Sequence, residues 1–242
     1  YVVRGSADEE DNAWAYRYIY FDGVVANKEC YAEGDYADPN DPVLSERLAR
    51  YEYDTNGVQT MKYTYYYHDD TENWMESKTL AAADEFGNVY YHWIDENYNE
   101  QSYGRHDRVV MGEAEGDGTK AYYYEYAGVT GNYSTVVGYA LADYSDPKDP
   151  DLTRQIKVFV YDKAGNDAAN IVEQYVYYND VTNYLAAHML EDADIDGNVY
   201  YHFINENYNG TGQGRLDEKV LGMLEPDSTR AYTYTYAGDT DN

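Results

Sequence analysis

Tyrosine alternates with other residues along three stretches of the chain, "AYRYIYF", "AYYYEY" and "AYTYTY". Successive side chains of a β-strand point to opposite faces, so this spacing places the tyrosines of each stretch on one face. We therefore predict three strands, each with an aromatic face available for assembly or glycan contact. The nine residues are Tyr16, Tyr18, Tyr20, Tyr122, Tyr124, Tyr126, Tyr232, Tyr234 and Tyr236.

Turn-forming residues separate the alternating stretches at short intervals. Clusters such as "SDPKDPD", "NDVTN" and "DADIDGN" are rich in Gly, Pro, Asn and Asp, which favour turn geometry. Helical periodicity is nearly absent, and the best helix candidate, 42–51, leads into the strand-like "YEYD". In the C-terminal part of the chain the pattern predicts strands at 135–144, 155–162, 171–178, 184–190, 198–204, 219–224 and 230–237.

The sequence repeats itself with a period of about 110 residues. Residues 85–132 and 195–242 are identical at 27 of 48 aligned positions, and "YADPNDP" returns as "YSDPKDP". We therefore divide the chain into a first copy at 23–132 and a second copy at 133–242. Residues 1–22 match the end of a copy, which predicts that they are the C-terminal part of a preceding one. We expect the chain to be a window on a longer tandem array.

These signals predict an all-β fold made of tandem antiparallel units with about seven short strands each. Two architectures fit that count, a β-sandwich and a β-spiral or solenoid. The stretches "YEYDTNG" and "FVYDKAG" resemble the Tyr-Asp repeats of the Rhs and teneurin shells, a resemblance that implies a wound β-sheet. More broadly, the chain resembles tandem-repeat β proteins of surfaces and fibres.

Composition narrows the classes of partner. The net charge is -29, from 46 acidic and 17 basic residues, so the clustered Lys and Arg that bind phosphate are lacking. The balance argues against nucleic acid and anionic membranes, and no apolar run is long enough to insert into a bilayer. The 34 tyrosines can replace an aliphatic core, since a packed ring contributes at most about 3 to 4 kcal/mol. Cys30 has Gly138 as its counterpart, so no copy depends on a thiol.

Three loops carry candidate binding or modification chemistry. Asp192, Asp194 and Asp196 precede a glycine with the spacing of calcium loops, which predicts calcium as a possible ligand, although the first copy has Ala82 and Phe86 at two of these positions. An ordinary hairpin turn also favours Asp and Gly. Sequons at Asn132 and Asn209 are glycan acceptors if the chain is secreted.

Catalytic signatures are missing from the sequence. It holds no nucleophile elbow, no zinc-protease motif and no phosphate-binding loop. His92 and His202 occupy one place in the two copies, which is typical of structural histidines. Glu96 and Glu206, near Asp95, are the one carboxylate cluster to weigh for glycosidase chemistry. We expect no enzymatic activity.

Three classes of function remain. The first is a structural segment of an extracellular or cell-surface filament, in which copies of the chain or of its repeat meet through strand edges and tyrosine faces. The second is an adhesin or carbohydrate-binding array that uses Trp74, Trp93 and exposed tyrosines as sugar-stacking platforms. The third is a polysaccharide-active enzyme. The first is the prediction, with the chain itself as the main partner.

Overall fold

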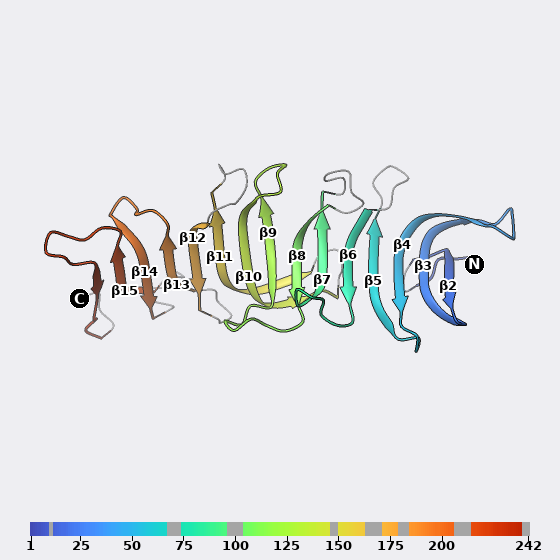
Figure 1. Ribbon diagram of the computed structural model, residues 1–242, viewed down its shortest axis with the longest axis horizontal. Coiled ribbons are helices and arrows are strands. Elements are labelled where there is room, and N and C mark those ends of the chain that lie inside the picture. The colour runs from blue at the N-terminus through green and yellow to red at the C-terminus, as the bar shows by residue number, and fades with distance from the viewer. Residues whose placement is uncertain are drawn as a thin grey trace. The chain divides into compact units, whose positions relative to one another are not determined.

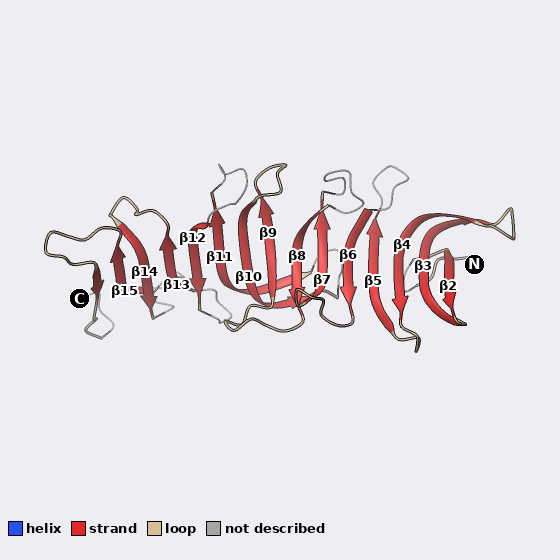
Figure 2. Ribbon diagram, viewed as in Figure 1, coloured by secondary structure: helices blue, strands red, loops and turns tan. Residues whose placement is uncertain are grey.

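The computed structural model is all-β, and it describes residues 1–9, 12–66, 74–95, 104–145, 150–162, 171–178, 184–205 and 214–238. Its strands are drawn in Figure 1, and the described part of the chain contains no helix (Figure 2). Accordingly, nothing in these residues is a helix that could cross a membrane. The all-β prediction is confirmed.

Among the described residues, the strands follow one another with no other element between them. The first eight are β1 (Val2–Val3), β2 (Ala15–Phe21), β3 (Val24–Asp35), β4 (Val43–Tyr53), β5 (Gln59–Tyr66), β6 (Trp74–Leu80), β7 (Asn88–Ile94) and β8 (Arg105–Met111). The others are β9 (Ala121–Tyr126), β10 (Tyr133–Asp143), β11 (Asp151–Tyr161), β12 (Ile171–Tyr177), β13 (Leu185–Leu190), β14 (Asn198–Ile204), β15 (Arg215–Leu221) and β16 (Ala231–Thr233).

The order of the strands in the sheet is their order in the chain, β1 to β16. Within the described residues, seven strands, β3 to β9, fall in the first copy and seven, β10 to β16, in the second, as predicted. A meander of this kind differs from the sandwich, one of the two architectures left open, because a sandwich needs two sheets and Greek-key connections. The strand predicted at 230–237 is shorter in the structure, where β16 ends at Thr233.

Contacts divide the chain into two compact units. Unit one comprises 1–113 together with 143–151, and unit two comprises 114–142 and 152–242. The division does not follow the sequence repeat, because unit one includes 143–151 of the second copy and unit two includes 114–132 of the first. In unit one, a small core forms from Ala13, Tyr16, Cys30 and Ala49, with Tyr18 and Tyr51 packed against it.

Candidate functional site

Each face of the sheet in unit one carries a row of side chains that runs across six strands, β2 to β7. Residues directly opposite each other on antiparallel strands point to the same face, so the register identifies the members of each row. The first row, here called the Arg17 row, is Arg17, Glu29, Arg50, Tyr63, Lys78 and Tyr91. The second, the Tyr18 row, is Tyr18, Lys28, Tyr51, Lys62, Thr79 and Tyr90.

Cations of these rows lie over tyrosine rings. The Nζ atom of Lys28 is 4.5 Å from the ring centre of Tyr16 and 5.3 Å from that of Tyr51. In the Arg17 row, Lys78 Nζ is 5.8 Å from the Tyr91 ring centre. Such contacts contribute about 0.5–1 kcal/mol each at exposed sites, and the aliphatic stems of the cations cover apolar ring surface. The rows thus supply packing on both faces of this sheet.

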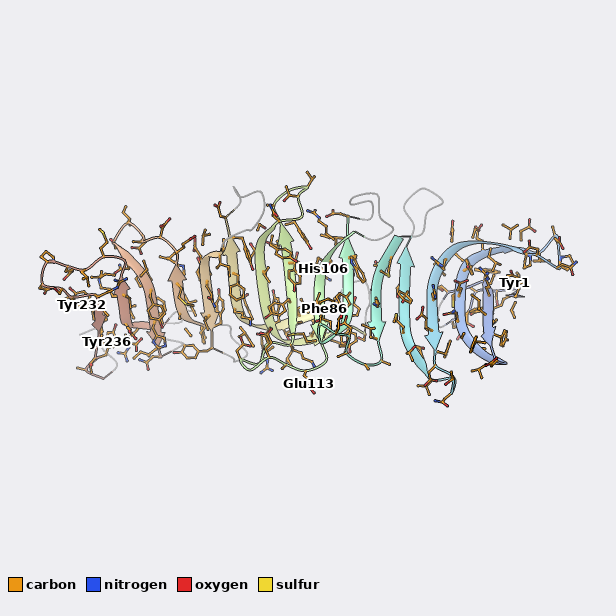
Figure 3. All side chains as sticks on the ribbon, in the orientation of Figure 1. Tyr1, Phe86, His106, Glu113, Tyr232 and Tyr236 are labelled. Carbon is orange, nitrogen blue, oxygen red and sulfur yellow. The ribbon has the colours of Figure 1, made fainter. Side chains whose placement is uncertain are left out.

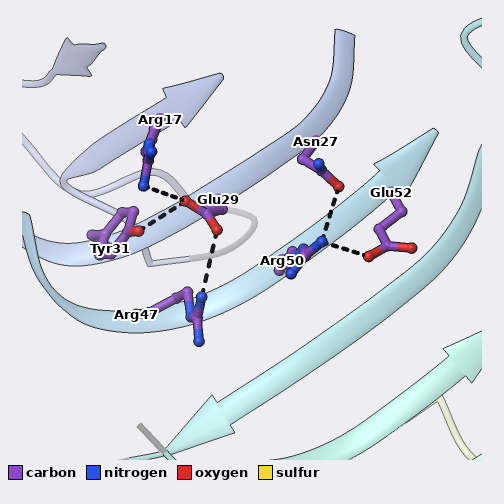
Figure 4. Close-up of polar contacts among 7 residues, drawn as sticks. All are labelled: Arg17, Asn27, Glu29, Tyr31, Arg47, Arg50 and Glu52. Carbon is purple, nitrogen blue, oxygen red and sulfur yellow. Dashed lines mark hydrogen bonds and ion pairs between the residues drawn. The ribbon is translucent and has the colours of Figure 1, made fainter. Parts of the chain in front are cut away.

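A buried carboxylate anchors the N-terminal end of the Arg17 row. Glu29 is 5% exposed, and it accepts hydrogen bonds from the Tyr31 hydroxyl at 3.0 Å and from Arg47 Nη1 at 3.4 Å (Figure 4). The Arg17 guanidinium lies 3.6 Å from the same carboxylate. Burial, together with the neighbouring Glu29, raises the pKa of Tyr31 to about 12. A buried charge is tolerated when it is paired in this way, so the cluster fixes the register of three strands.

Unit two carries a comparable row, Tyr175, His188, Tyr201, Lys219 and Tyr232, across β12 to β16. The rings of Tyr175 and His188 stack at 4.2 Å and 8°, and the Tyr201 ring follows at 6.2 Å from His188. Lys219 Nζ lies 5.2 Å from the ring centre of Tyr232, a residue labelled in Figure 3. The sequence pattern predicted aromatic faces but missed these alternating cations, which become visible once the register pairs the strands.

A near-parallel ring pair occurs at the same place in both copies. Trp93 stacks on Tyr91 with ring centres 5.6 Å apart and 20° between planes, and Phe203 lies 6.4 Å from Tyr201 at 14°. Trp93 is half-buried, so part of its ring faces solvent. Flat aromatic surfaces of this kind can stack against a sugar ring. The side chain of Trp74, the other predicted platform, lies outside the described residues.

The nine alternating tyrosines do not share one environment. Tyr16 is 4% exposed and belongs to the core of unit one, whereas Tyr20 on the same strand is 62% exposed. Tyr18 is half-buried between these extremes. Alternation therefore predicted the strand correctly but not the burial of each ring, because the neighbouring strands set how much of a ring is covered.

In unit two the alternating tyrosines pack with one another or bond to the turns. Tyr124 and Tyr126 flank Tyr133 at 5.0 Å and 5.2 Å. The Tyr122 hydroxyl donates to Glu115 at 2.7 Å. At the C-terminal end, Tyr232 donates to Glu225 and Tyr236 donates to the backbone carbonyl of Leu216, while Tyr234 is 39% exposed.

The predicted calcium loop is built as a turn around one carboxylate. Asp194 Oδ1 accepts the backbone N–H groups of Asp196 at 3.0 Å and Asn198 at 2.9 Å, and its other oxygen accepts the Tyr201 hydroxyl. The hydrogen bond from Tyr201, followed by that from Asn198, lowers the pKa of Asp194. Asp192 and Asp196 are both exposed.

The first copy forms the same turn without the other two aspartates. Asp84 accepts the backbone N–H groups of Phe86 at 3.0 Å and Asn88 at 2.9 Å. Across the described stretches of the chain, no group of three or more His, Cys, Asp or Glu side chains is placed to hold a metal ion. The turn accounts for these oxygens without an ion, and calcium binding stays a prediction.

The two sequons have different places. Asn132 is half-buried in the turn between β9 and β10, where its backbone N–H donates to Thr130 Oγ1 at 3.3 Å and its carbonyl accepts from Ala127 N at 2.9 Å. Asn209 lies outside the described residues. Glycosylation at both positions stays a prediction.

The repeated histidines form carboxylate pairs. His92 Nδ1 contacts Asp107 Oδ1, and His202 Nδ1 lies 2.6 Å from Asp217 Oδ1. Ser77 lies opposite His92 in the sheet, but it is 1% exposed and bonds to Tyr90, so the trio is enclosed among packed side chains. The carboxylates Glu96 and Glu206 lie outside the described residues, and Asp95 accepts Arg105 Nε at 2.9 Å.

One buried cation in unit two had no signal in the sequence. Lys157 is 8% exposed, and its Nζ donates to Glu115 at 2.6 Å and to Asp117 at 2.9 Å. Burial alone would lower the pKa of Lys157, but the two hydrogen bonds to the acids outweigh burial and raise it. The acids lie about 40 residues away in sequence on the β8–β9 turn, beyond the reach of any local pattern.

Comparison with known proteins assigns the chain to no family. No protein-family model matches the chain, and no curated protein matches it. Among solved structures, a Bacteroides fragilis protein described as having unknown function matches at 15% identity, covering 88% of this chain and 93% of that one, with a TM-score of 0.19. A score this low supports no argument about fold or function.

Proposed function

We propose that this chain is a structural segment of an extracellular filament or cell-surface fibre built from tandem tyrosine-rich β units. The observation that carries the proposal is the strand order, in which each strand neighbours the strands that precede and follow it in the chain. Adding a copy to such a sheet extends it without changing the existing pairs. Repeat proteins that grow in this way are structural or form long binding surfaces, and their stability is a sum over neighbouring repeats.

The side chains of the sheet also suit a fibre. In unit one the rows of tyrosine and cation give packing to both faces, so this part of the sheet does not need a second sheet to cover it. The net charge of -29 makes neighbouring fibres repel, which keeps them dispersed until salt or low pH weakens the repulsion. Contacts between copies would use strand edges and tyrosine faces.

Imaging of the cells that make the protein tests this proposal. An antibody raised against the chain should label filaments or fibres outside the cell in immunogold electron microscopy, with no labelling after the gene is deleted. Labelling confined to the cell interior, or to dispersed material in a sample whose surface fibres stay unlabelled, would contradict the proposal.

A carbohydrate-binding array is the second candidate, favoured by the ring platform of Trp93 on Tyr91. If the platform binds glycans, saturable binding on a glycan array should be lost in Trp93→Ala and kept in Tyr20→Ala, which removes an exposed ring elsewhere. Stacking of a single ring is worth about 1 kcal/mol, so the loss should be at least about fivefold in affinity. Equal binding by the two variants would exclude this site.

A further inference from the structure

A tyrosine of the second copy covers a tyrosine of the first. Tyr144, just after β10, belongs by its contacts to unit one, and its ring stacks on Tyr90 with centres 5.0 Å apart and 25° between planes. Tyr90 is fully buried, at 0% exposure, and burial raises its pKa. Offset-stacked rings of this kind contribute about 0.5–1.5 kcal/mol beyond the area they bury. Tyr144, just after the end of β10, therefore docks on β7.

The corresponding surface of the second copy is less deeply buried. We call Tyr200, His202, Asp217 and Val220 the Tyr200 patch, since Tyr200 is the counterpart of Tyr90. The side chains of His202 and Asp217 are 33% and 25% exposed, against 8% and 5% for the equivalent pair His92 and Asp107. Val220 is half-buried, whereas its counterpart Val110 is 1% exposed. Among the described residues, no ring stacks on Tyr200.

The first copy has an equivalent tyrosine, on which no ring stacks among the described residues. Tyr36 is the counterpart of Tyr144 and is 69% exposed. The same kind of turn holds both tyrosines. Asp35 Oδ1 accepts the N–H of Ala37 at 2.9 Å, and Asp143 Oδ1 accepts the N–H of Ser145 at 2.9 Å. The turn thus positions the tyrosine before any docking takes place. A preformed contact of this kind loses little conformational entropy on binding.

We infer that the Tyr200 patch is a docking surface for the hairpin end of a further repeat unit, which presents a tyrosine held by an Asp turn in a Tyr-x-Asp-Pro sequence. The inference rests on the proposed tandem array, and the contact between Tyr144 and Tyr90 is its template. This contact forms the joint between successive copies, in which the ring of the incoming tyrosine stacks on Tyr200 and covers His202 and Val220.

One substitution between the copies makes this joint weaker than its template. Arg108 lies opposite His92, whereas Glu218 lies opposite His202. The incoming hairpin end is acidic, because its turn contains several aspartates, as at Asp35, Asp38 and Asp41. Like charges repel, so Glu218 disfavours docking, and Glu218→Arg should strengthen it.

Tyrosine nitration measured residue by residue tests the joint. The 242-residue chain is compared with a chain to which a further copy of 133–242 has been fused, and the probe is tetranitromethane with peptide mass spectrometry. Nitration of Tyr200 should slow about tenfold in the fused chain, as expected for one stacked ring pair. Tyr20 and Tyr36 should react equally in both chains, and Tyr144→Ala in the unfused chain should expose Tyr90 as a positive control.

Two variants of the added copy assign the protection to the docking ring. Replacing its equivalent of Tyr144 by alanine should restore the nitration of Tyr200, while phenylalanine at that position should keep the protection, which excludes misfolding as the cause. Glu218→Arg in the fused chain should slow nitration further. Equal nitration of Tyr200 in the fused and unfused chains, or protection that survives the alanine variant, would overturn the inference.

The outcome is separable from that of the proposed function. Nitration reports the joint in solution, so it can succeed even if immunogold labelling finds no fibre on the cell. Conversely, labelled fibres combined with an unprotected Tyr200 would keep the filament and exclude this joint.

Discussion

The two copies fill the same small core in opposite ways. At the start of the first copy, Cys30 and Ala49 pack with Ala13 and Tyr16 of the preceding partial copy, and Tyr51 packs against them. At the start of the second copy, the counterparts of Cys30, Ala49 and Tyr51 are Gly138, Lys157 and Phe159, and those of Ala13 and Tyr16 are Thr119 and Tyr122, at the end of the first copy. One core is apolar and the other contains a buried ammonium group, although the strands around both are alike.

Side-chain volume explains why Cys30 and Ala49 of the first copy are replaced by Gly138 and Lys157 in the second. A Cβ atom added at Gly138 would lie 2.9 Å from Cγ of Lys157 and 3.1 Å from Cγ2 of Thr119, so the lysine stem occupies the space that Cys30 fills in the first copy. The cation over the rings changes strand as well. Lys28 supplies it in the first copy, while Lys157 Nζ lies 5.3 Å from the Tyr122 ring centre in the second. The fold therefore specifies the total volume and one cation, not the residue that provides each.

The largest effect should come from filling the space of the lysine stem. Gly138→Cys should lower the free energy of unfolding by about 3 kcal/mol, because overpacking adds to the loss of the Lys157 hydrogen bonds. Urea denaturation provides the measurement. Gly116→Cys is the matched control, since a Cβ at Gly116 would meet nothing within 4 Å.

The double variant sharpens the comparison. Gly138→Cys combined with Lys157→Ala recreates the apolar core of the first copy, so it should recover most of the stability lost by Gly138→Cys alone. Additive losses in this double-mutant cycle would show that the two positions do not share space, contrary to the geometry.

Removal of the buried charge should have a smaller effect. Lys157→Met keeps the stem but leaves Glu115 and Asp117 without their partner, and it should cost about 1 to 2 kcal/mol, since both acids are partly exposed. A stability loss above that of Gly138→Cys would reverse the predicted order.

The pH dependence of that loss is set by the directions of the pKa shifts. Burial raises the pKa of Asp117, but the bonds from Lys157 and Thr119 outweigh burial and lower it, so its contribution is present above about pH 4 and is lost as pH falls. The raised pKa of Lys157 makes its contribution complete below about pH 10 and lost at higher pH. The difference between wild type and Lys157→Met should thus be constant from about pH 5 to 9 and shrink on both sides.

The smallest effect concerns the cation of the first copy. Lys28→Met removes the charge above Tyr16 and Tyr51 but keeps an apolar stem, so it should cost about 0.5 to 1 kcal/mol. Thermal unfolding measures it, with Lys120→Met as a lysine control outside that ring pair. A loss of stability as large as that of Lys157→Met would contradict the expectation that the less buried cation contributes less.

Local sequence patterns predicted the strands, whereas the contacts between strands depend on how the strands pair. Alternating tyrosines and Asp-Gly turns gave the all-β class and seven strands per copy, because both signals depend on neighbouring residues. The single meander could not be separated from a sandwich, since strand partners are set by register. For the same reason the sequence did not predict three contacts between residues distant in sequence. These are the pair of Glu29 and Arg47, the bonds of Lys157 to Glu115 and Asp117, and the stacking of Tyr144 on Tyr90.

The length of chains with added copies tests the central claim most directly. Chains carrying one, two and four further copies of 133–242 should lengthen in electron micrographs by a constant amount for each copy, up to about 34 Å, because seven strands lie about 4.8 Å apart. Particles that become rounder instead of longer as copies are added would contradict a sheet built to be extended.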